Sequence, residues 1–271
     1  MGYFRQAALA IKFLKIKSNI NKLQLKNRDK IIINYNHYLK EGFTMTTTIK
    51  IDSSLPILEQ GDKLTRAEFE HRYQAMPNVK KAELIEGVVY MSSPVRAKHH
   101  GQPHSMIITW LGVYCAATPG IMLCDNTTVR LDLDNEPQPD VLLRIETEYG
   151  GQSKISEDDY IEGAPELIVE IASSSVSYDL HNKLNVYRRN RVQEYLVWRV
   201  QDQELDWFEL QEGKYIQLTS NSTGIIESII FPGLNLPVAA LITGDLATVL
   251  EELKRGIATQ AHQKFIEELQ K

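Results

Sequence analysis

The sequence has little cysteine. Its only two cysteines, Cys115 and Cys124, form neither a disulfide framework nor a zinc-ligand set within the 271 residues. A small secreted domain stabilised by disulfides is therefore excluded. A reducing, cytoplasmic location is the simplest expectation.

Long apolar runs are also missing, so no segment is expected to cross a membrane. The first 20 residues mix basic and apolar side chains, without the continuous apolar stretch and cleavage site of a secretion signal. Neither an internal repeat nor a low-complexity tract is present. With 43% hydrophobic and 24% charged residues, the composition is that of a globular protein with a sizeable core.

Basic residues are too few to balance the acidic ones outside the N-terminal segment. Residues 1–44 contain nine of the 30 Lys and Arg residues but only two of the 35 Asp and Glu residues. Their net charge is about +7, and that of the remaining chain is about −12. An acidic protein binds polyphosphate backbones poorly, so contact with nucleic acid would require a local basic patch or metal ions.

A second methionine, Met45, opens the sequence MTTT, which is typical of a protein start. We therefore expect residues 1–44 to be a basic N-terminal extension that is either not native or disordered. The functional alternative is a basic amphipathic arm that binds nucleic acid or an anionic surface. The predicted domains are an α/β domain over residues 45–240 and a C-terminal amphipathic helix over residues 241–271.

Apolar periodicity and turn residues predict a mixture of helices and strands. Thr65 and Glu68 have the spacing of a capping box at the start of a helix over residues 64–73. Glu86 and Gly87 form the turn of a predicted hairpin over residues 82–91. Further helices are expected over residues 104–117, 178–190 and 245–271. Further strands are expected over residues 121–124, 127–133, 141–145, 166–172, 195–200 and 205–210.

Three residues in this pattern are candidates for metal chemistry. Asp140 follows Pro139 at the start of one strand, Glu170 lies within an otherwise apolar strand, and Lys183 lies on the following helix. A carboxylate in a buried strand must be paired, protonated or bound to a cation. Two carboxylates on adjacent strands suit Mg²⁺, which lowers the pKa of bound water and stabilises charge on a phosphodiester. A lysine nearby would orient that water or share the charge.

The order of these residues resembles the PD-(D/E)XK nuclease superfamily. More narrowly, residues 64–236 are similar to the Uma family of restriction-endonuclease-like proteins. The matching stretches are residues 83–87, 91–94, 139–141, 165–171, 194–198 and 231–234, together with Lys183 and Tyr187. The resemblance implies a restriction-endonuclease-like core, a mixed β-sheet flanked by helices. It also implies Mg²⁺-dependent phosphodiester cleavage by Asp140, Glu170 and Lys183.

The resemblance further implies a helper acid from the hairpin, for which Glu86 is the first candidate. Glu83, His100 and His104 are candidates for lining the substrate. The chain departs from the superfamily in one place, because Ala172 occupies the usual lysine position, two residues after Glu170. The assignment of Lys183 therefore requires its helix to fold back toward Glu170.

Each candidate also has a structural interpretation. Asp140 can cap a turn after Pro139, and Glu170 can pair with Lys183 or Arg188 without a metal. The predicted function is a Mg²⁺- or Mn²⁺-dependent endonuclease, a hydrolase acting on nucleic acid, most simply DNA. The alternative is a non-catalytic module on the same fold that binds nucleic acid or protein. A homodimer formed through the C-terminal helix would suit cleavage of two strands.

Overall fold

The computed structural model describes residues 34–38, 44–48, 55–91 and 96–271, and its chain forms two compact units, Met1–Pro56 and Ile57–Lys271. In the first unit, β1 (Asn34–Tyr38) pairs with β2 (Thr44–Thr48) as an antiparallel hairpin. Strand β2 spans the domain boundary predicted at residue 45. Most of the predicted N-terminal extension lies outside the described residues, so its nature stays a prediction.

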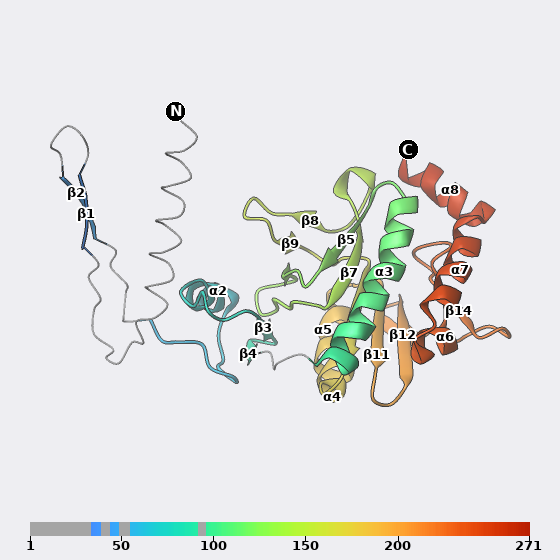
Figure 1. Cartoon of the computed structure of the whole chain (residues 1–271), viewed down its shortest axis with the longest axis horizontal. Helices are drawn as coiled ribbons and strands as arrows, with labels where there is room; N and C mark the ends of the chain where they lie inside the picture. Colours follow the sequence, from blue (N-terminus) through green and yellow to red (C-terminus); the bar gives the residue numbers. More distant parts are fainter. Residues whose placement is uncertain (1–33, 39–43, 49–54, 92–95) are drawn as a thin grey trace. The chain divides into compact units, whose positions relative to one another are not determined.

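The second unit is built around a six-stranded sheet, in which β10 and β11 are parallel and the other neighbours are antiparallel. Its strands in spatial order are β13 (Lys214–Gln217), β12 (Glu204–Gln211), β11 (Glu194–Arg199), β10 (Leu167–Ala172), β7 (Val141–Ile145) and β5 (Ile121–Asp125). Helices lie on both of its faces (Figure 1). The predicted fold class, a mixed sheet flanked by helices, is confirmed.

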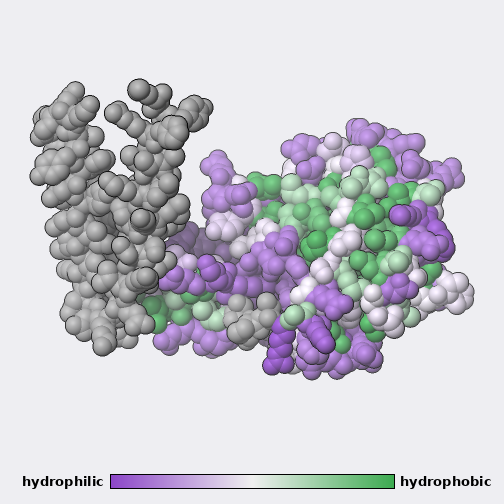
Figure 2. Space-filling model, in the orientation of Figure 1, coloured by the Kyte–Doolittle hydropathy of each residue, from purple (hydrophilic) through white to green (hydrophobic). Residues whose placement is uncertain are grey.

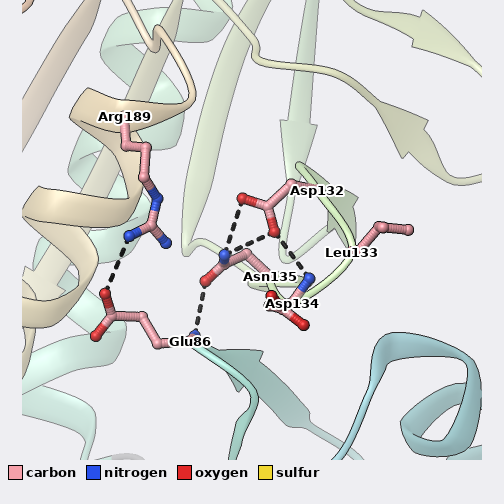
Figure 3. Close-up of a pocket in the computed structure, with 6 residues that line it drawn as sticks. All are labelled: Glu86, Asp132, Leu133, Asp134, Asn135 and Arg189. Atoms are coloured by element: carbon pink, nitrogen blue, oxygen red, sulfur yellow. Dashed lines mark hydrogen bonds and ion pairs between the residues drawn. The ribbon is translucent and has the colours of Figure 1, made fainter.

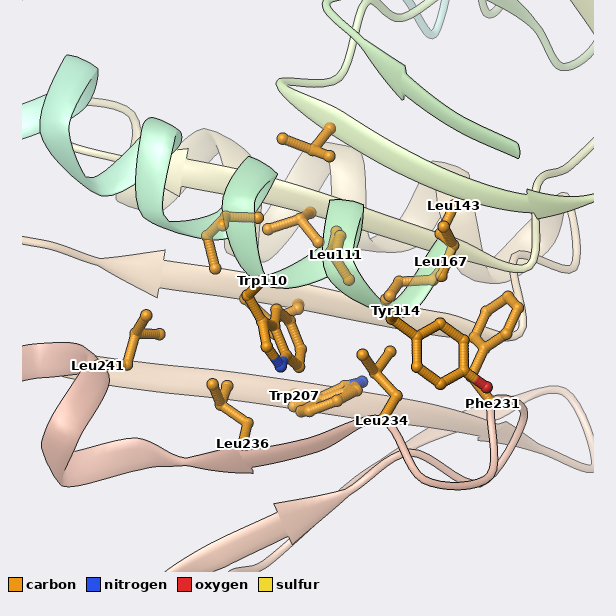
Figure 4. Close-up of a cluster of buried hydrophobic side chains, with 14 of the residues drawn as sticks. Trp110, Leu111, Tyr114, Leu143, Leu167, Trp207, Phe231, Leu234, Leu236 and Leu241 are labelled. Carbon is orange, nitrogen blue, oxygen red and sulfur yellow. The ribbon is translucent and has the colours of Figure 1, made fainter. Parts of the chain in front are cut away.

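One face of the sheet is covered by α3 (Gln102–Ala117), the helix predicted to be mostly buried. Trp110 on this helix meets Trp207 on β12 edge to face, with 5.9 Å between the ring centroids. Its indole nitrogen donates to the carbonyl of Asn235, so the one polar atom of the buried ring is satisfied. Both tryptophans belong to the largest apolar cluster among the described residues (Figure 4).

The C-terminal segment begins with α6 (Val238–Thr243), and the single helix predicted after it is two helices, α7 (Leu246–Ile257) and α8 (Gln260–Leu269). The single-helix prediction over residues 245–271 is wrong because Thr259 starts a new helix, accepting a hydrogen bond from the backbone of His262. On the apolar face of α7, Val249 and Leu253 are fully buried within the same chain, whereas Leu246, Leu250 and Ile257 are only partly buried. The homodimer expected through the C-terminal segment stays a prediction.

The opposite face of the sheet carries one nearly continuous helical segment. It consists of α4 (Val176–Tyr178), a π-helical turn η3 (Asp179–Lys183) and α5 (Leu184–Arg189). A second apolar cluster lies between this helical segment and the sheet. The hairpin of β3 (Ala82–Ile85) and β4 (Val88–Met91) contributes Ile85 to it. Its turn matches the prediction, because Glu86 and Gly87 both have positive φ, at 53° and 72°.

The remaining elements are short. Helix α2 (Arg66–Gln74) begins at Thr65, whose side chain accepts from the backbone nitrogen of Glu68 as predicted. A second π-helical turn, η1 (Ala97–Gly101), precedes α3, and a 3₁₀ turn, η2 (Thr147–Tyr149), follows β7. The small strands are β6 (Val129–Arg130), β8 (Lys154–Ile155), β9 (Ile161–Glu162), β14 (Ile225–Glu227) and β15 (Asn235–Pro237).

Apolar residues gather in the middle of the face that carries α3 and α7, with hydrophilic residues around them (Figure 2). Among the described residues, no helix has the length and apolar character needed to cross a membrane.

Candidate active site

Strand register brings Asp140 and Glu170 together. In the antiparallel pair of β7 and β10, Val141 lies opposite Val169, and continuing this register by one pair places Asp140 opposite Glu170. Directly opposed residues point to the same face of a sheet, with Cβ atoms about 5 Å apart. Their neighbours Val141 and Val169 belong to the apolar cluster on the sheet face that α3 covers. Successive side chains of a strand point to opposite faces, so both carboxylates point to the other face, under η3 and α5.

The two oxygens of Asp140 have different environments. Oδ2 accepts a hydrogen bond of 2.8 Å from the backbone nitrogen of Ile171, the residue after Glu170. Oδ1 lies 3.4 Å from the ammonium of Lys81 and 3.6 Å from Nε2 of His100. Burial alone would raise the pKa of Asp140, but Lys81, His100 and the Ile171 hydrogen bond together lower it.

The helix after β10 folds back onto the sheet and buries Lys183 among carboxylates. Its Nζ lies 2.9 Å from Oε1 of Glu170 and 2.9 Å from Oε1 of Glu83, and all three side chains are at most 9% exposed. Asp179, one turn earlier on the same helix face, is 4.0 Å from the same ammonium. The contact that Lys183 needed for the predicted role is therefore present despite its displacement from position 172.

Charge in this cluster is out of balance. Burial raises the pKa of Glu170 to about 8; Lys183 opposes this, while Asp140, Asp179 and Glu83 reinforce it. Burial likewise raises the pKa of Asp179 to about 6. Burial lowers the pKa of Lys183, but the surrounding carboxylates outweigh it and raise that pKa well above its ordinary value. The lysine thus stays charged, yet one ammonium does not neutralise its three acidic neighbours.

The hairpin supplies Glu83 to this cluster, and Glu86 lies elsewhere. Oε1 of Glu83 also accepts from the backbone nitrogen of Gln138, which fixes the carboxylate next to Lys183. Glu86 occupies the turn, where its carboxylate is 3.2 Å from Arg189 and its backbone nitrogen donates to Asn135. It lines a separate pocket of about 420 Å³ (Figure 3). The structure therefore does not bring the predicted helper acid Glu86 to Asp140 and Glu170.

The two candidate histidines border Asp140 from α3 and the turn before it. Nδ1 of His100 lies 3.3 Å from the carbonyl oxygen of Ile171, and its Nε2 faces Asp140. His104 contacts the backbone carbonyl of Asp140 at 3.1 Å and the carboxylate of Asp125 at 3.0 Å. Their rings stack with 5.7 Å between centroids. Both remain candidates for contact with substrate.

Sequence reasoning did not identify Lys81, Asp179 and Tyr178 as members of this site. Their spacing could have indicated them, because residues two apart in a strand or four apart in a helix lie on the same face. Lys81 is two residues from Glu83, and Asp179 is four from Lys183. Tyr187, which the sequence offered only as part of the family resemblance, donates a hydrogen bond of 2.8 Å to Oε1 of Glu170. Tyr178 covers the ammonium of Lys183, with its ring centroid 5.3 Å from Nζ.

The carboxylates of the site bear on which metal ion could bind there. Among the described residues, no three His, Cys, Asp or Glu side chains converge as a ready-made ligand set. Asp140 and Glu170 nevertheless place two carboxylates opposite each other, and Mg²⁺ commonly binds one or two carboxylates while keeping several waters. The pair suits Mg²⁺ or Mn²⁺ better than zinc, which prefers three or four nitrogen and sulfur ligands.

The mixed sheet with helices on both faces makes this an α/β protein (Figure 1). The family model "Uma2: Putative restriction endonuclease" matches residues 66–239, and the chain belongs to this family. The resemblance seen in the sequence is thereby confirmed, and membership supports a nuclease role, that is, hydrolysis of phosphodiester bonds.

No curated protein matches the chain. Among solved structures, the chain is similar to "a putative nuclease belonging to DUF820 from Anabaena variabilis ATCC 29413", with 14% sequence identity and a TM-score of 0.48. The likeness covers 60% of this chain and 90% of that one.

Proposed function

We propose that this protein is a Mg²⁺- or Mn²⁺-dependent endonuclease that hydrolyses phosphodiester bonds in DNA. The observation that carries the proposal is the charge of the site. The site contains four carboxylates and two ammonium groups; the carboxylates are those of Glu83, Asp140, Glu170 and Asp179, and the ammonium groups those of Lys81 and Lys183. When all four carboxylates are ionised, the net charge of these groups is −2, which a divalent cation would cancel. Buried like charges of this kind are costly unless a cation is bound.

Asp140 and Glu170 are the proposed ligands. A divalent cation bound there supplies Lewis-acid stabilisation of charge on the phosphodiester and makes water a better nucleophile at neutral pH. Oδ1 of Asp140 is the proposed ligand atom, because Oδ2 already accepts one hydrogen bond from the backbone of Ile171. Tyr187 and Lys183 both bind Oε1 of Glu170 and hold its carboxylate in place.

Lys183 is the proposed charge-balancing and orienting lysine. It holds its proton firmly, so it supplies a fixed positive charge and a hydrogen-bond donor to Glu170 within the site. Glu83 anchors the other side of the ammonium, and we assign the helper role to it instead of Glu86. His100 and His104, at the outer edge of Asp140, are proposed to line the substrate.

Incubation with supercoiled plasmid tests this function. The wild type is expected to nick plasmid in Mg²⁺ or Mn²⁺ but not in EDTA, and Asp140→Ala is expected to abolish nicking. Asp134→Ala is the matched control, because Asp134 lies in the separate pocket beside Glu86. Metal-dependent nicking that persists in Asp140→Ala, or wild type inert on DNA and RNA of every form, would overturn the assignment.

A further inference from the structure

Two lysines reach the candidate site, but they differ in exposure. The side chain of Lys183 is 3% exposed and lies between Glu83 and Glu170. That of Lys81 is 21% exposed and lies beside Asp140, which is 7% exposed. Lys183 is thus enclosed by carboxylates, whereas Lys81 is the cation at the solvent side of the site.

Lys81 is directed to the site by the hairpin. It immediately precedes β3 and is two residues before Glu83, and residues two apart in an extended segment point to the same side. Glu83 faces Lys183, and the ammonium of Lys81 lies 3.4 Å from Oδ1 of Asp140. The hairpin therefore delivers one acid and one base to the same face.

Lys81 approaches the carboxylate that is proposed to bind the metal ion. Oδ2 of Asp140 accepts a hydrogen bond from the buried backbone nitrogen of Ile171, whereas Oδ1 faces the ammonium of Lys81. An ammonium and a divalent cation at one carboxylate oxygen repel each other. A divalent cation at Asp140 would therefore repel the ammonium of Lys81 and favour its pairing with an anion that arrives at the site. The anion that a nuclease brings to this place is the phosphate of its substrate.

We propose that Lys81 is a substrate-binding residue that leaves Asp140 for a phosphate of the nucleic acid when the divalent cation binds. This inference rests on the proposed function and adds the group that couples metal binding to substrate binding. A lysine ammonium on a flexible stem is well suited to such an exchange, because it binds phosphate as a point charge without a fixed geometry.

Calorimetric titration of Mn²⁺ at pH 8 tests the first half of the proposal. Lys81→Met removes the competing ammonium, so it is expected to bind Mn²⁺ about three- to tenfold more tightly than the wild type. The matched control is Lys80→Met, which makes the same charge change at an exposed neighbour and is expected to stay within about twofold. Lys81→Arg keeps the charge and is expected to resemble the wild type. Thermal unfolding without metal verifies that each variant is folded.

Binding of a short DNA duplex in Ca²⁺ tests the second half. Lys81→Met is expected to weaken binding about tenfold and to reduce the slope of log K against log salt by about one, the loss of one phosphate contact. The proposal is overturned if Lys81→Met binds Mn²⁺ no more tightly than Lys80→Met, or if both variants weaken DNA binding equally. If wild-type Mn²⁺ binding does not depend on Asp140, the proposed function fails and this inference fails with it.

Discussion

The ammonium of Lys183 lies 2.9 Å from Oε1 of Glu170, and both side chains are only 3% exposed. Lys183→Met would leave Glu170 and Glu83 buried without their shared cation. Removing one partner of a buried ion pair costs about 3–5 kcal/mol, and we expect a loss of that size in urea unfolding without metal. The exposed Lys214→Met is the control. A loss below about 1 kcal/mol would show that Lys183 does not hold these carboxylates.

Two tyrosines near Glu170 are expected to respond in opposite directions. The buried hydroxyl of Tyr178 has no hydrogen-bond partner among the described residues, whereas that of Tyr187 donates to Glu170. An unsatisfied buried polar group costs about 1–3 kcal/mol. Tyr178→Phe should therefore stabilise the protein by about 1 kcal/mol, and Tyr187→Phe should destabilise it by at least as much. Urea unfolding compares the two, and effects of the same sign would contradict the geometry.

The hairpin offers a test that separates the two acids. Glu83→Gln removes a charge 2.9 Å from Lys183, so we expect at least a tenfold loss of plasmid cleavage, roughly 1.4 kcal/mol of barrier. Glu86→Gln removes only a half-exposed ion pair with Arg189, so activity should stay within about twofold. If Glu86→Gln is the more damaging change, the helper acid is Glu86, as the sequence first indicated.

The stability of the protein should fall as pH rises because of Glu136. Burial first, and then Glu70, raise the pKa of Glu136 to about 8, and its Oε2 has no hydrogen-bond partner among the described residues. A carboxyl whose pKa is higher in the folded state binds its proton more tightly there. Its stabilising effect is therefore complete below about pH 4 and is lost as pH rises through 8.

Glu136→Gln cannot ionise, so it should remove this part of the pH dependence. Urea unfolding from pH 5 to pH 9 measures it. The wild type should lose stability relative to Glu136→Gln by more than about 1.4 kcal/mol, the value of one pKa unit. Parallel pH profiles for the two proteins would show that Glu136 keeps an ordinary pKa.

Local patterns in the sequence predicted much of the fold. The capping box at Thr65, the turn at Glu86 and Gly87, and the apolar helix over residues 104–117 all depend on neighbours within a few residues. The break in the C-terminal helix was missed, although Thr259 is a favourable N-cap. Gly256 packs there directly against the backbone of Gly233, a contact between distant parts of the chain that periodicity does not reveal.

In the candidate site, too, local sequence patterns predicted some residues, and contacts between distant parts of the chain determined the others. Asp140 and Glu170 were identified because each carboxylate stands at an unusual place in its strand, and their opposition then depends on strand register. The choice between Glu83 and Glu86 depended on which part of the hairpin faces the sheet. Lys81 looked like any exposed lysine in the sequence, and only the packing of the hairpin beside β7 brings it to Asp140.

The central claim is that Asp140 and Glu170 share one divalent cation. Anomalous diffraction from crystals soaked in Mn²⁺ tests it most directly. We expect a single strong peak between these carboxylates, about 2.2 Å from Oδ1 of Asp140, with the ammonium of Lys81 moved away. No peak at this position under saturating Mn²⁺, with Lys81 still against Asp140, would contradict the account.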